Sequence, residues 1–364
     1  MQAIYTPRIR QLIISGILAL SIYLIGLSPG FVEKIYVHGI YPYISVTLRF
    51  FSSFFPFSLG DVLYLLLIGY ILWSIYRFCR RYFKKQLTNP DLISALLRAA
   101  TFCLILYIAF KLLWGLNYSR LPIAEQLGIK NEKYDTKELV ALGDYMVDQI
   151  NTIQILRNPD TLIQHIYSAE ELEPKAASSY QQLTTKNKFF KYNSPALKPV
   201  LSSWIVTKIG LEGYYNPLSG EANLNMMLNE ANLPFVACHE ISHQLGIARE
   251  DEANLFGYLA ATASADLNFK YSGNYCVLKN VLFEIGVKSP VDYARLRKKI
   301  NAATLKDFKA DREFWRKYNS NMFGYMETTL DQFLKLNNQQ KGVDSYQDIV
   351  LWLYNIHKKE LRLP

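Results

Sequence analysis

The sequence is poor in cysteine, which argues against two kinds of framework. Its 364 residues include only four cysteines, and none of them is part of a Cys-x-x-Cys pair. Neither a metal knuckle nor a network of disulfides is therefore expected. A bridge between Cys238 and Cys276 is the alternative, but Cys238 falls inside a predicted helix, so we expect buried free thiols. Internal repeats and low-complexity tracts are also missing from the sequence.

Acidic residues are scarce in the first third of the chain. Residues 1–116 contain three acids against eleven lysines and arginines, so this segment has a net charge of +8 (eleven minus three). The whole chain has a net charge of +9, which leaves +1 for the remainder. The positive charge therefore belongs to the hydrophobic N-terminal part, and no nucleic-acid-binding surface is expected.

Hydrophobic residues, in contrast, make up half of the chain, which favours contact with a membrane. Three segments reach the roughly 18 predominantly apolar residues that a spanning helix needs, at about 11–31, 58–78 and 92–116. A cleaved signal peptide is the alternative for the first segment. However, no small-x-small cleavage site precedes Pro29, and two more spans follow. We expect residues 1–116 to form a membrane anchor with three transmembrane helices.

The basic residues predict the orientation of this anchor. Two arginines precede the first span and the run RFCRRYFKK follows the second, whereas residues 31–60 hold only two basic residues. By the positive-inside rule, the N-terminus is cytoplasmic, and residues 117–364 lie on the periplasmic or extracellular side of the cytoplasmic membrane. The aromatic segment 31–60 is expected to lie along that membrane face as short amphipathic helices, with His38 as an interfacial polar residue.

From residue 117 onward, the pattern is typical of a soluble and mostly helical domain. Apolar residues recur at helical spacing in 138–153 and 161–186, and His165 is expected to be structural. Within 220–229, GEANLNMMLN, the residues alternate as in a half-exposed strand. The expected fold is mainly α, with three N-terminal transmembrane helices followed by an extracytoplasmic α+β domain.

The segment ACHEISHQLGIAREDEAN, residues 237–254, carries a pattern with clear chemistry. His239 and His243 are four positions apart, so they share one helix face and their imidazoles can bind one metal ion. Glu240 lies between them, where its carboxylate can take a proton from a water molecule that attacks a carbonyl group. Zinc lowers the pKa of such a water towards about 7. The pattern therefore predicts a catalytic Zn²⁺ site.

A third ligand is needed, because His-Glu-x-x-His arises by chance in roughly one in a few hundred chains of this composition. Gly246 is suited to end the first helix in a left-handed conformation. Acids open the next helix, where the helix dipole favours them whatever their function. Glu250 and Asn254 are four positions apart, whereas Glu252 points about 200° round the helix from Glu250. Because Asn254 is placed to bind an imidazole N–H, Glu250 is favoured over Glu252 as the third ligand.

His-Glu-x-x-His followed by Glu-x-x-x-Asn resembles the gluzincin metallopeptidases, such as thermolysin and the CaaX-processing membrane proteases. The resemblance implies that Glu240 is the general base and that Asn254 supports a histidine. It also implies that the three zinc ligands are His239, His243 and Glu250. Only six residues separate His243 from Glu250, fewer than in most gluzincins. The turn also resembles that of the metzincins, but Arg249 stands where their third histidine would be, and arginine cannot bind zinc.

Six motifs extend a closer resemblance over nearly the whole chain. They are PFSLGDVLY, LLWGLNYSR, GYYNPLSGEANLN, CHEISHQLGIAREDEANLFGYLA, YSGNY and GVDSYQDIV. As a set they are similar to the domain-of-unknown-function family 3810, bacterial membrane proteins with three spans and a zincin-like motif. The resemblance implies a zincin-like domain for residues 117–364.

Two further parts of such a site have candidates in the sequence. The strand at 220–229 is placed to be an edge strand that binds a peptide by strand addition, although an ordinary strand fits its position equally well. Tyr271 in KYSGNY and Tyr215 are candidate donors to the oxyanion of the transition state. Structural packing is the alternative for each tyrosine.

The expected function is that of a membrane-anchored zinc metallopeptidase, whose partners are the lipid bilayer and a protein or peptide substrate. A non-catalytic binding or assembly protein on a zincin scaffold is the alternative, and the presence of Glu240 argues against it. An intramembrane protease is less favoured, because the apolar run around the motif is far shorter than about 18 residues. The sequence predicts neither the substrate's identity nor an oligomeric state.

Overall fold

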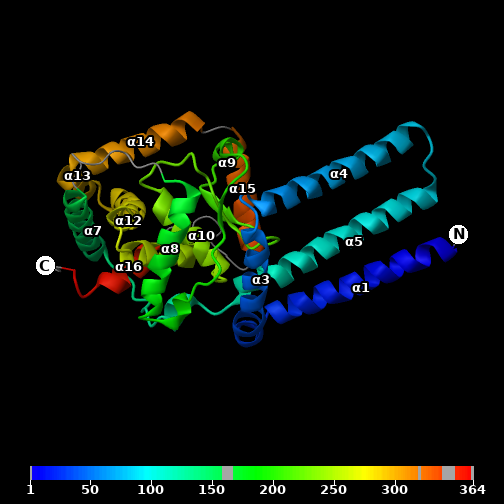
Figure 1. Cartoon of the computed structure of the whole chain (residues 1–364), viewed down its shortest axis with the longest axis horizontal. Helices are drawn as coiled ribbons and strands as arrows, with labels where there is room; N and C mark the ends of the chain where they lie inside the picture. Colours follow the sequence, from blue (N-terminus) through cyan, green and yellow to red (C-terminus); the bar gives the residue numbers. More distant parts are fainter. Residues whose placement is uncertain (1, 158–166, 319–320, 338–348, 362–364) are drawn as a thin grey trace.

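In the computed structural model, the three apolar segments form long helices that project from one end of the molecule (Figure 1). They are α1 (Gln2–Gly26), α4 (Leu59–Phe83) and α5 (Asn89–Leu113). Each is long and apolar enough to cross a membrane, as expected of a multi-pass membrane protein. The first ends at Gly26 instead of near residue 31, because Pro29 disfavours a helical conformation in the residue before it and starts a new helix.

The structure describes residues 2–157, 167–318, 321–337 and 349–361. Besides the three long helices, these residues form short and medium helices, most of them α-helices, one a π-helix (η1) and two of the 3-10 type (η2, η3). In chain order they are α2 (Pro29–Phe31), η1 (Val32–Ile40), α3 (Tyr41–Ser53), η2 (Gly115–Ser119), α6 (Ile123–Gln126), α7 (Thr136–Leu156), α8 (Ala169–Thr184), η3 (Lys188–Phe190), α9 (Ser203–Lys208), α10 (Leu233–Gln244), α11 (Glu250–Ala263), α12 (Leu267–Lys288), α13 (Pro290–Lys299), α14 (Ala302–Tyr318), α15 (Asn321–Leu336) and α16 (Ile349–His357).

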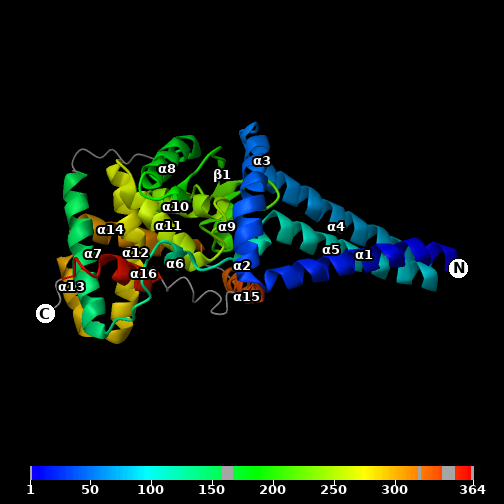
Figure 2. The ribbon, with the colours of Figure 1, turned by 90° about the horizontal axis from the view of Figure 1, so that it is seen from below.

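The connector between the first two spans is helical, and α3 lies across their inner ends (Figure 2). One face of α3 is buried, with residues at helical spacing, and the other exposes large aromatic side chains. This confirms short helices with two distinct faces in 31–60, while their contact with a membrane stays a prediction. In η1, His38 lies 3.1 Å from the carboxylate of Glu33 and is more than half exposed.

The described part of residues 117–364 forms a helical body behind the spans. It is built around α10, the helix that carries the two histidines of the motif. α10 packs against α11, α12 and α8, and α12 also packs against α7. Their facing side chains form one continuous apolar core in which Met146 and Phe256 are fully buried. The helix predicted at 138–153 is confirmed as α7, and α8 lies within the predicted 161–186. His165 lies outside the described residues.

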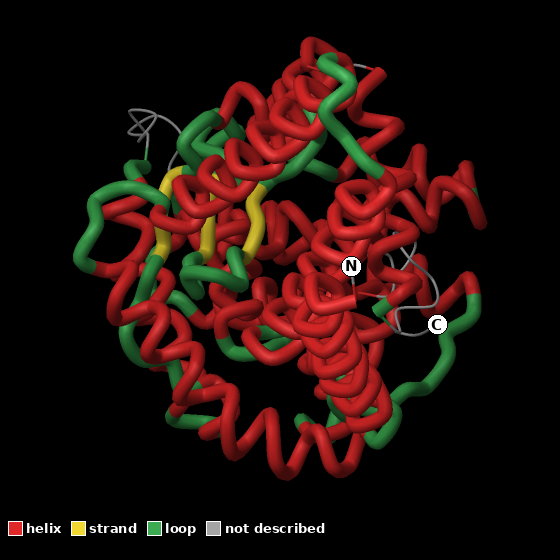
Figure 3. The backbone as a smooth tube through the Cα atoms, turned by 90° about the vertical axis from the view of Figure 1, so that its right-hand side faces the viewer, coloured by secondary structure: helices red, strands yellow, loops and turns green. Residues whose placement is uncertain are grey.

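The chain also forms a small three-stranded sheet (Figure 3), which packs against α10 through β2 and β3. Its strands are β1 (Leu197–Pro199), β2 (Gly213–Tyr215) and β3 (Ala222–Leu224), in the order β1-β3-β2, with β1 parallel and β2 antiparallel to β3. The strand predicted at 220–229 is thus shortened to β3. It is also central, so the prediction that it is an edge strand is wrong. It ends where Asn225 accepts a hydrogen bond from the Met227 N–H and turns the chain.

The spans and the body share a second hydrophobic cluster, so residue 116 does not separate two independently packed units. The cluster combines aromatic side chains of the connector and of the end of α5 with side chains of the body. Its buried members are Ile22, Val32, Tyr36, Val37, Tyr41, Trp114, Leu116, Tyr118, Tyr215, Ala248 and Leu334.

The first turn of α4 docks onto the β2–β3 hairpin through a buried glutamate. The Glu221 carboxylate accepts hydrogen bonds from the backbone N–H groups of Leu59 (3.0 Å) and Gly60 (2.7 Å), and from the Ser219 hydroxyl (2.7 Å). These backbone groups belong to the first helical turn, whose N–H groups have no partner within the helix. The hairpin therefore caps a membrane span.

Replacing Gly60 with alanine is expected to destabilise this junction by about 1–3 kcal/mol, the usual cost of inserting a carbon into a packed site. A Cβ at Gly60 would lie 2.3 Å from Nδ2 of Asn216 and 2.5 Å from Oγ of Ser219, and both of these side chains are buried. Thermal unfolding of the full-length protein in detergent measures the loss. Gly69→Ala is the control, because it changes the same helix where a Cβ has open space. Equal melting temperatures for the two variants would contradict this packing.

Candidate metal centre

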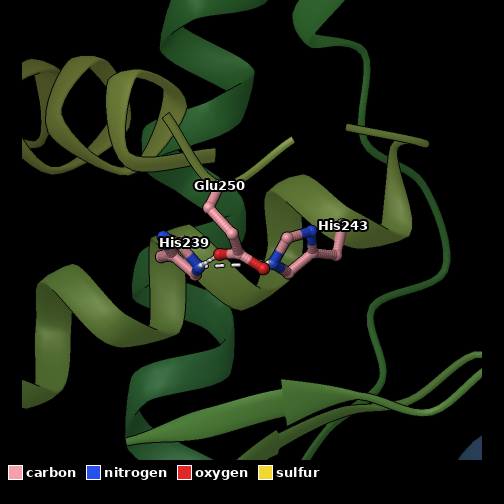
Figure 4. Close-up of side chains that lie close together, drawn as sticks. All are labelled: His239, His243 and Glu250. Carbon is pink, nitrogen blue, oxygen red and sulfur yellow. Dashed lines mark hydrogen bonds and ion pairs between the residues drawn. The ribbon is translucent and has the colours of Figure 1, made fainter. Parts of the chain in front are cut away.

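A sharp turn brings two consecutive helices over the same point. α10 ends at Gln244, and Gly246 follows with φ +82°, a conformation that a residue with a Cβ adopts only with strain. α11 then begins at Glu250, which lies above the face of α10 that carries His239 and His243 (Figure 4). The left-handed turn predicted at Gly246 is confirmed.

The three side chains converge with the spacing of a metal site. Nε2 of His239 lies 3.2 Å from Nε2 of His243. Oε2 of Glu250 lies 3.3 Å from the first nitrogen and 3.8 Å from the second (Figure 4). Ligand atoms that bind zinc tetrahedrally at 2.0–2.1 Å are about 3.3–3.4 Å apart. The two nitrogens and the oxygen therefore match three corners of a tetrahedron around a zinc ion.

The protonation of His243 suits a ligand. Its Nδ1 lies 2.6 Å from the carbonyl oxygen of Ile247, which can only accept a hydrogen bond, so Nδ1 carries the proton. Nε2 is then left with a lone pair directed at the other two side chains. Burial lowers the pKa of His243 to about 4, so the ring is neutral at physiological pH.

The pKa of His239 shifts in the opposite direction from that of His243. Burial alone would lower the pKa of His239, but the hydrogen bond to Glu250 and the nearby Glu240 carboxylate outweigh burial and raise it. Its Nδ1 is buried and has no hydrogen-bond partner among the described residues. The carboxylates around this ring also favour a cation at the same place.

Glu250, and not Glu252, faces the two imidazoles. The Glu252 side chain is almost fully buried elsewhere, where it accepts a hydrogen bond from the backbone N–H of Ile123 (2.6 Å). Burial raises the pKa of Glu252 to about 7. The two acids therefore point to different sides of α11, as the helical geometry predicted. Glu252 stabilises the segment that follows α5.

Asn254 does not have the predicted contact with an imidazole. It is buried one turn after Glu250, yet in the part of the chain that the structure describes it makes no hydrogen bond to either ring. For His243 the reason is local, because the backbone carbonyl of Ile247, just past the turn, already occupies its Nδ1. The support of this histidine is therefore a main-chain group, which carries no signature in the sequence.

The glutamate of the motif lies between α10 and the edge strand β2. Glu240 is buried, and a Cβ on Gly213 would lie 2.6 Å from its Oε1, so only glycine lets the strand come this close. Burial, together with the carboxylates of Glu250 and Glu212, raises the pKa of Glu240 to about 8, against the opposing effect of His239. Its Oε2 is buried and has no hydrogen-bond partner among the described residues.

Two residues near the cluster were not predicted from the sequence. Glu212 directly precedes β2, and its carboxylate is close enough to influence the titration of both His239 and Glu240. Burial raises the pKa of Glu212. Burial and the neighbouring Glu250 likewise raise the pKa of Tyr118 well above its usual range. The motifs GYYNPLSGEANLN and LLWGLNYSR point to these regions but assign no role to any side chain in them.

Side chains of α3 and of the residue after α5 form hydrogen bonds with the C-terminal end of α10. The indole Nε1 of Trp114, the first residue after α5, donates to the carbonyl oxygen of His243 (3.2 Å). The hydroxyl of Tyr41, at the start of α3, lies 3.2 Å from the same oxygen. Ser45 donates to the carbonyl oxygen of Gln244 (2.7 Å). The N–H of Gly246 also donates to the carbonyl oxygen of His243 (2.9 Å), so α3, the residue after α5 and the turn together cap the end of α10.

Tyr271 finds no support as a catalytic residue. Its hydroxyl is 2.6 Å from the carboxylate of Asp307 and 3.2 Å from the hydroxyl of Thr304, so it is engaged with α14 and not with the cluster. The structural alternative thus applies to Tyr271. Tyr215, the other candidate, packs against Trp114 with ring centroids 5.1 Å apart, and its hydroxyl lies 3.4 Å from that of Tyr41.

Comparisons with known proteins bear on the family alone. No curated protein matches the chain, and no solved structure does. A family model described as "Protein of unknown function (DUF3810)" matches residues 36–354, which include two of the three spans, the connector helix α3 and nearly all of the body. The chain therefore belongs to the DUF3810 family.

Proposed function

We propose that this protein is a membrane-anchored zinc metallopeptidase with a zincin-like catalytic core. The observation that carries the proposal is the tetrahedral spacing of two imidazole nitrogens and one carboxylate oxygen, 3.2–3.8 Å apart, next to a buried glutamate. Two histidines and a carboxylate are the ligand set of several catalytic zinc sites, in which the fourth position stays open. The donor atoms and their spacing fit zinc.

His239, His243 and Glu250 would hold the ion. When bound, zinc supplies Lewis-acid chemistry, which polarises a peptide carbonyl and makes water more acidic. A cation bound beside Glu240 would favour its ionised form, and the carboxylate would then act as the general base that accepts the proton of the water attacking the carbonyl carbon. It then returns this proton to the nitrogen of the leaving amine as the C–N bond breaks. The hydrolysis needs no other co-reactant.

The edge strand β2 is the element that would bind the peptide. β3 pairs with one side of β2, and among the described residues no strand pairs with its outer edge. Such an edge can bind an extended chain by strand addition. The contact between Gly213 and the Glu240 carboxylate brings this edge to the general base, so a peptide aligned on β2 passes the reacting groups.

The proposal includes an orientation. The positive-inside rule favours a cytoplasmic N-terminus and a catalytic body, residues 117–364, on the periplasmic or extracellular side of the cytoplasmic membrane. The partners are then the bilayer and a protein or peptide substrate on that side.

Zinc analysis of the full-length protein, purified in detergent, tests the proposal. We expect about one zinc ion per chain, as a site with three protein ligands implies. An anomalous-scattering map at the zinc edge should show the ion between the two imidazoles and Glu250. A folded protein that is free of zinc, and whose stability does not change when zinc is added, would rule the proposal out.

A further inference from the structure

We propose that the substrate is a polypeptide tethered to the same membrane, and that it is cut close to the point where it leaves the bilayer. This inference rests on the proposed peptidase function and adds the class of substrate to it. Three features carry it: the distance of the metal centre from the spans, the apolar outer face of α3, and the direction of the edge strand β2.

The metal centre lies next to the end of a membrane span. Trp114 follows Leu113, the last residue of α5, and its indole both donates to the carbonyl of His243 and packs against the His243 ring, with centroids 5.9 Å apart. A single side chain thus separates a metal ligand from the end of a transmembrane helix. If α5 spans the bilayer, the metal centre is at the level of the lipid headgroups.

The outer face of α3 fits the interfacial region of a bilayer. The buried face of the helix is mostly polar and contacts the body, with Tyr41, Ser45, Arg49 and Ser52. The opposite face exposes side chains that are 52–75% accessible, namely Tyr43, Phe50, Phe51 and Phe54. This distribution is the reverse of that on a helix whose outer face meets water. Because α3 lies between two spans in the chain and across their ends, lipid is the partner that covers this face (Figures 1 and 2).

A second apolar surface lies at the same end of the molecule. Around the start of α9, Leu201, Trp204 and Ile205 are 47–59% exposed. The backbone N–H of Leu201 donates to the carboxylate of Asp61 in the first turn of α4 (2.8 Å), which fixes this surface beside a span. The membrane-facing side of the body therefore includes both α3 and the start of α9.

The edge strand β2 leads from the general base to the second span. Gly213 contacts the Glu240 carboxylate, and the hydroxyl of the next residue, Tyr214, donates to Asp61 in the first turn of α4. Because an extended peptide advances about 3.3 Å per residue, a short segment on β2 covers the distance between the reacting groups and the bilayer surface. A polypeptide that emerges from the membrane can bridge this distance, and its tether holds it at the site.

The experiment uses full-length protein reconstituted in phosphatidylethanolamine–phosphatidylglycerol vesicles. The probe is a randomised twelve-residue segment in three forms: free in solution, attached to a leucine-rich transmembrane helix, and attached to that helix through a twelve-residue Gly-Ser spacer. Mass spectrometry identifies the bonds that are cut, and Glu240→Gln protein provides the background. We expect the anchored forms to be cut at least tenfold faster than the free form. The cuts should also stay at a constant distance from the helix, so that they fall in the spacer when it is present.

The possible outcomes separate this inference from the proposed function. Equal rates for free and anchored segments would overturn the inference and leave a peptidase that acts on soluble chains. Cuts that follow the residue sequence, regardless of their distance from the helix, would also overturn it. If none of the three forms is cut above the Glu240→Gln background, both the peptidase function and the inference fail.

Discussion

Replacing Glu240 with glutamine is expected to lower the rate of peptide hydrolysis by roughly 10²–10⁴-fold, the usual contribution of a general base. Glutamine has the same shape as glutamate, but its amide cannot take a proton from water. The ligand atoms of His239, His243 and Glu250 are untouched by the change, so the variant should still contain about one zinc ion per chain. Parallel measurements of hydrolysis and zinc content check both parts of the prediction.

The control for this variant is Glu313→Gln. Glu313 is an exposed residue of α14 that forms a loose pair with Lys309, 3.9 Å away, so its replacement should change neither hydrolysis nor zinc content. A Glu240→Gln protein that hydrolyses peptides at the normal rate would remove the proposed mechanism. If the variant fully replaced the natural protein in a deletion strain, a non-catalytic role on a zincin scaffold would become the better explanation.

Glu250→Ala is expected to weaken zinc binding, whereas Glu252→Ala is expected to keep the zinc and destabilise the fold. Glu250→Ala removes one of three protein ligands. Since structural zinc sites with four ligands bind with about 10–16 kcal/mol, or about 2.5–4 kcal/mol per ligand, the loss of one ligand should lower zinc affinity roughly 10²–10³-fold. Glu252→Ala should keep the zinc and instead destabilise the fold by about 1–3 kcal/mol, because the buried N–H of Ile123 loses its acceptor.

Zinc titration and thermal unfolding of both variants, made in the full-length chain, provide the comparison. The two acids are two positions apart on one helix and are both acidic residues of its first turn, so each variant serves as the control for the other. Loss of zinc from Glu252→Ala, with retention in Glu250→Ala, would exchange their roles and contradict the geometry of the site.

Local regularities explain which features could be predicted from the sequence. His239 and His243 share a face because the helix repeats every 3.6 residues, and the same rule separates Glu250 from Glu252. Gly246 marks the turn because only glycine adopts its conformation without strain. The three spans follow from the length of their apolar runs. Each of these features depends on residues that are close together in the chain.

The features that were missed depend on contacts between distant residues or on the main chain. β3 is central because β1 and β2 pair with its two sides, and this pairing has no local signal. The support of His243 is a backbone carbonyl, so Asn254, although suitably spaced, is not needed for it. Trp114 and Tyr41 reach the carbonyl of His243 across 129 and 202 positions of the chain, respectively. Their roles become visible only in three dimensions.

The capping of α10 by the connector and by the end of α5 also orders the biogenesis of the protein. Ribosomes make Tyr41, Ser45 and Trp114 long before His243, and all three lie beside the helices proposed to span the membrane. Under the proposed topology, the end of α10 therefore meets these three side chains only after the spans have been inserted, and they form the template onto which it packs. A chain that fails to insert lacks that template. The proposed peptidase activity should therefore depend on insertion of the spans, and a chain that is still in the cytoplasm is expected to be inactive.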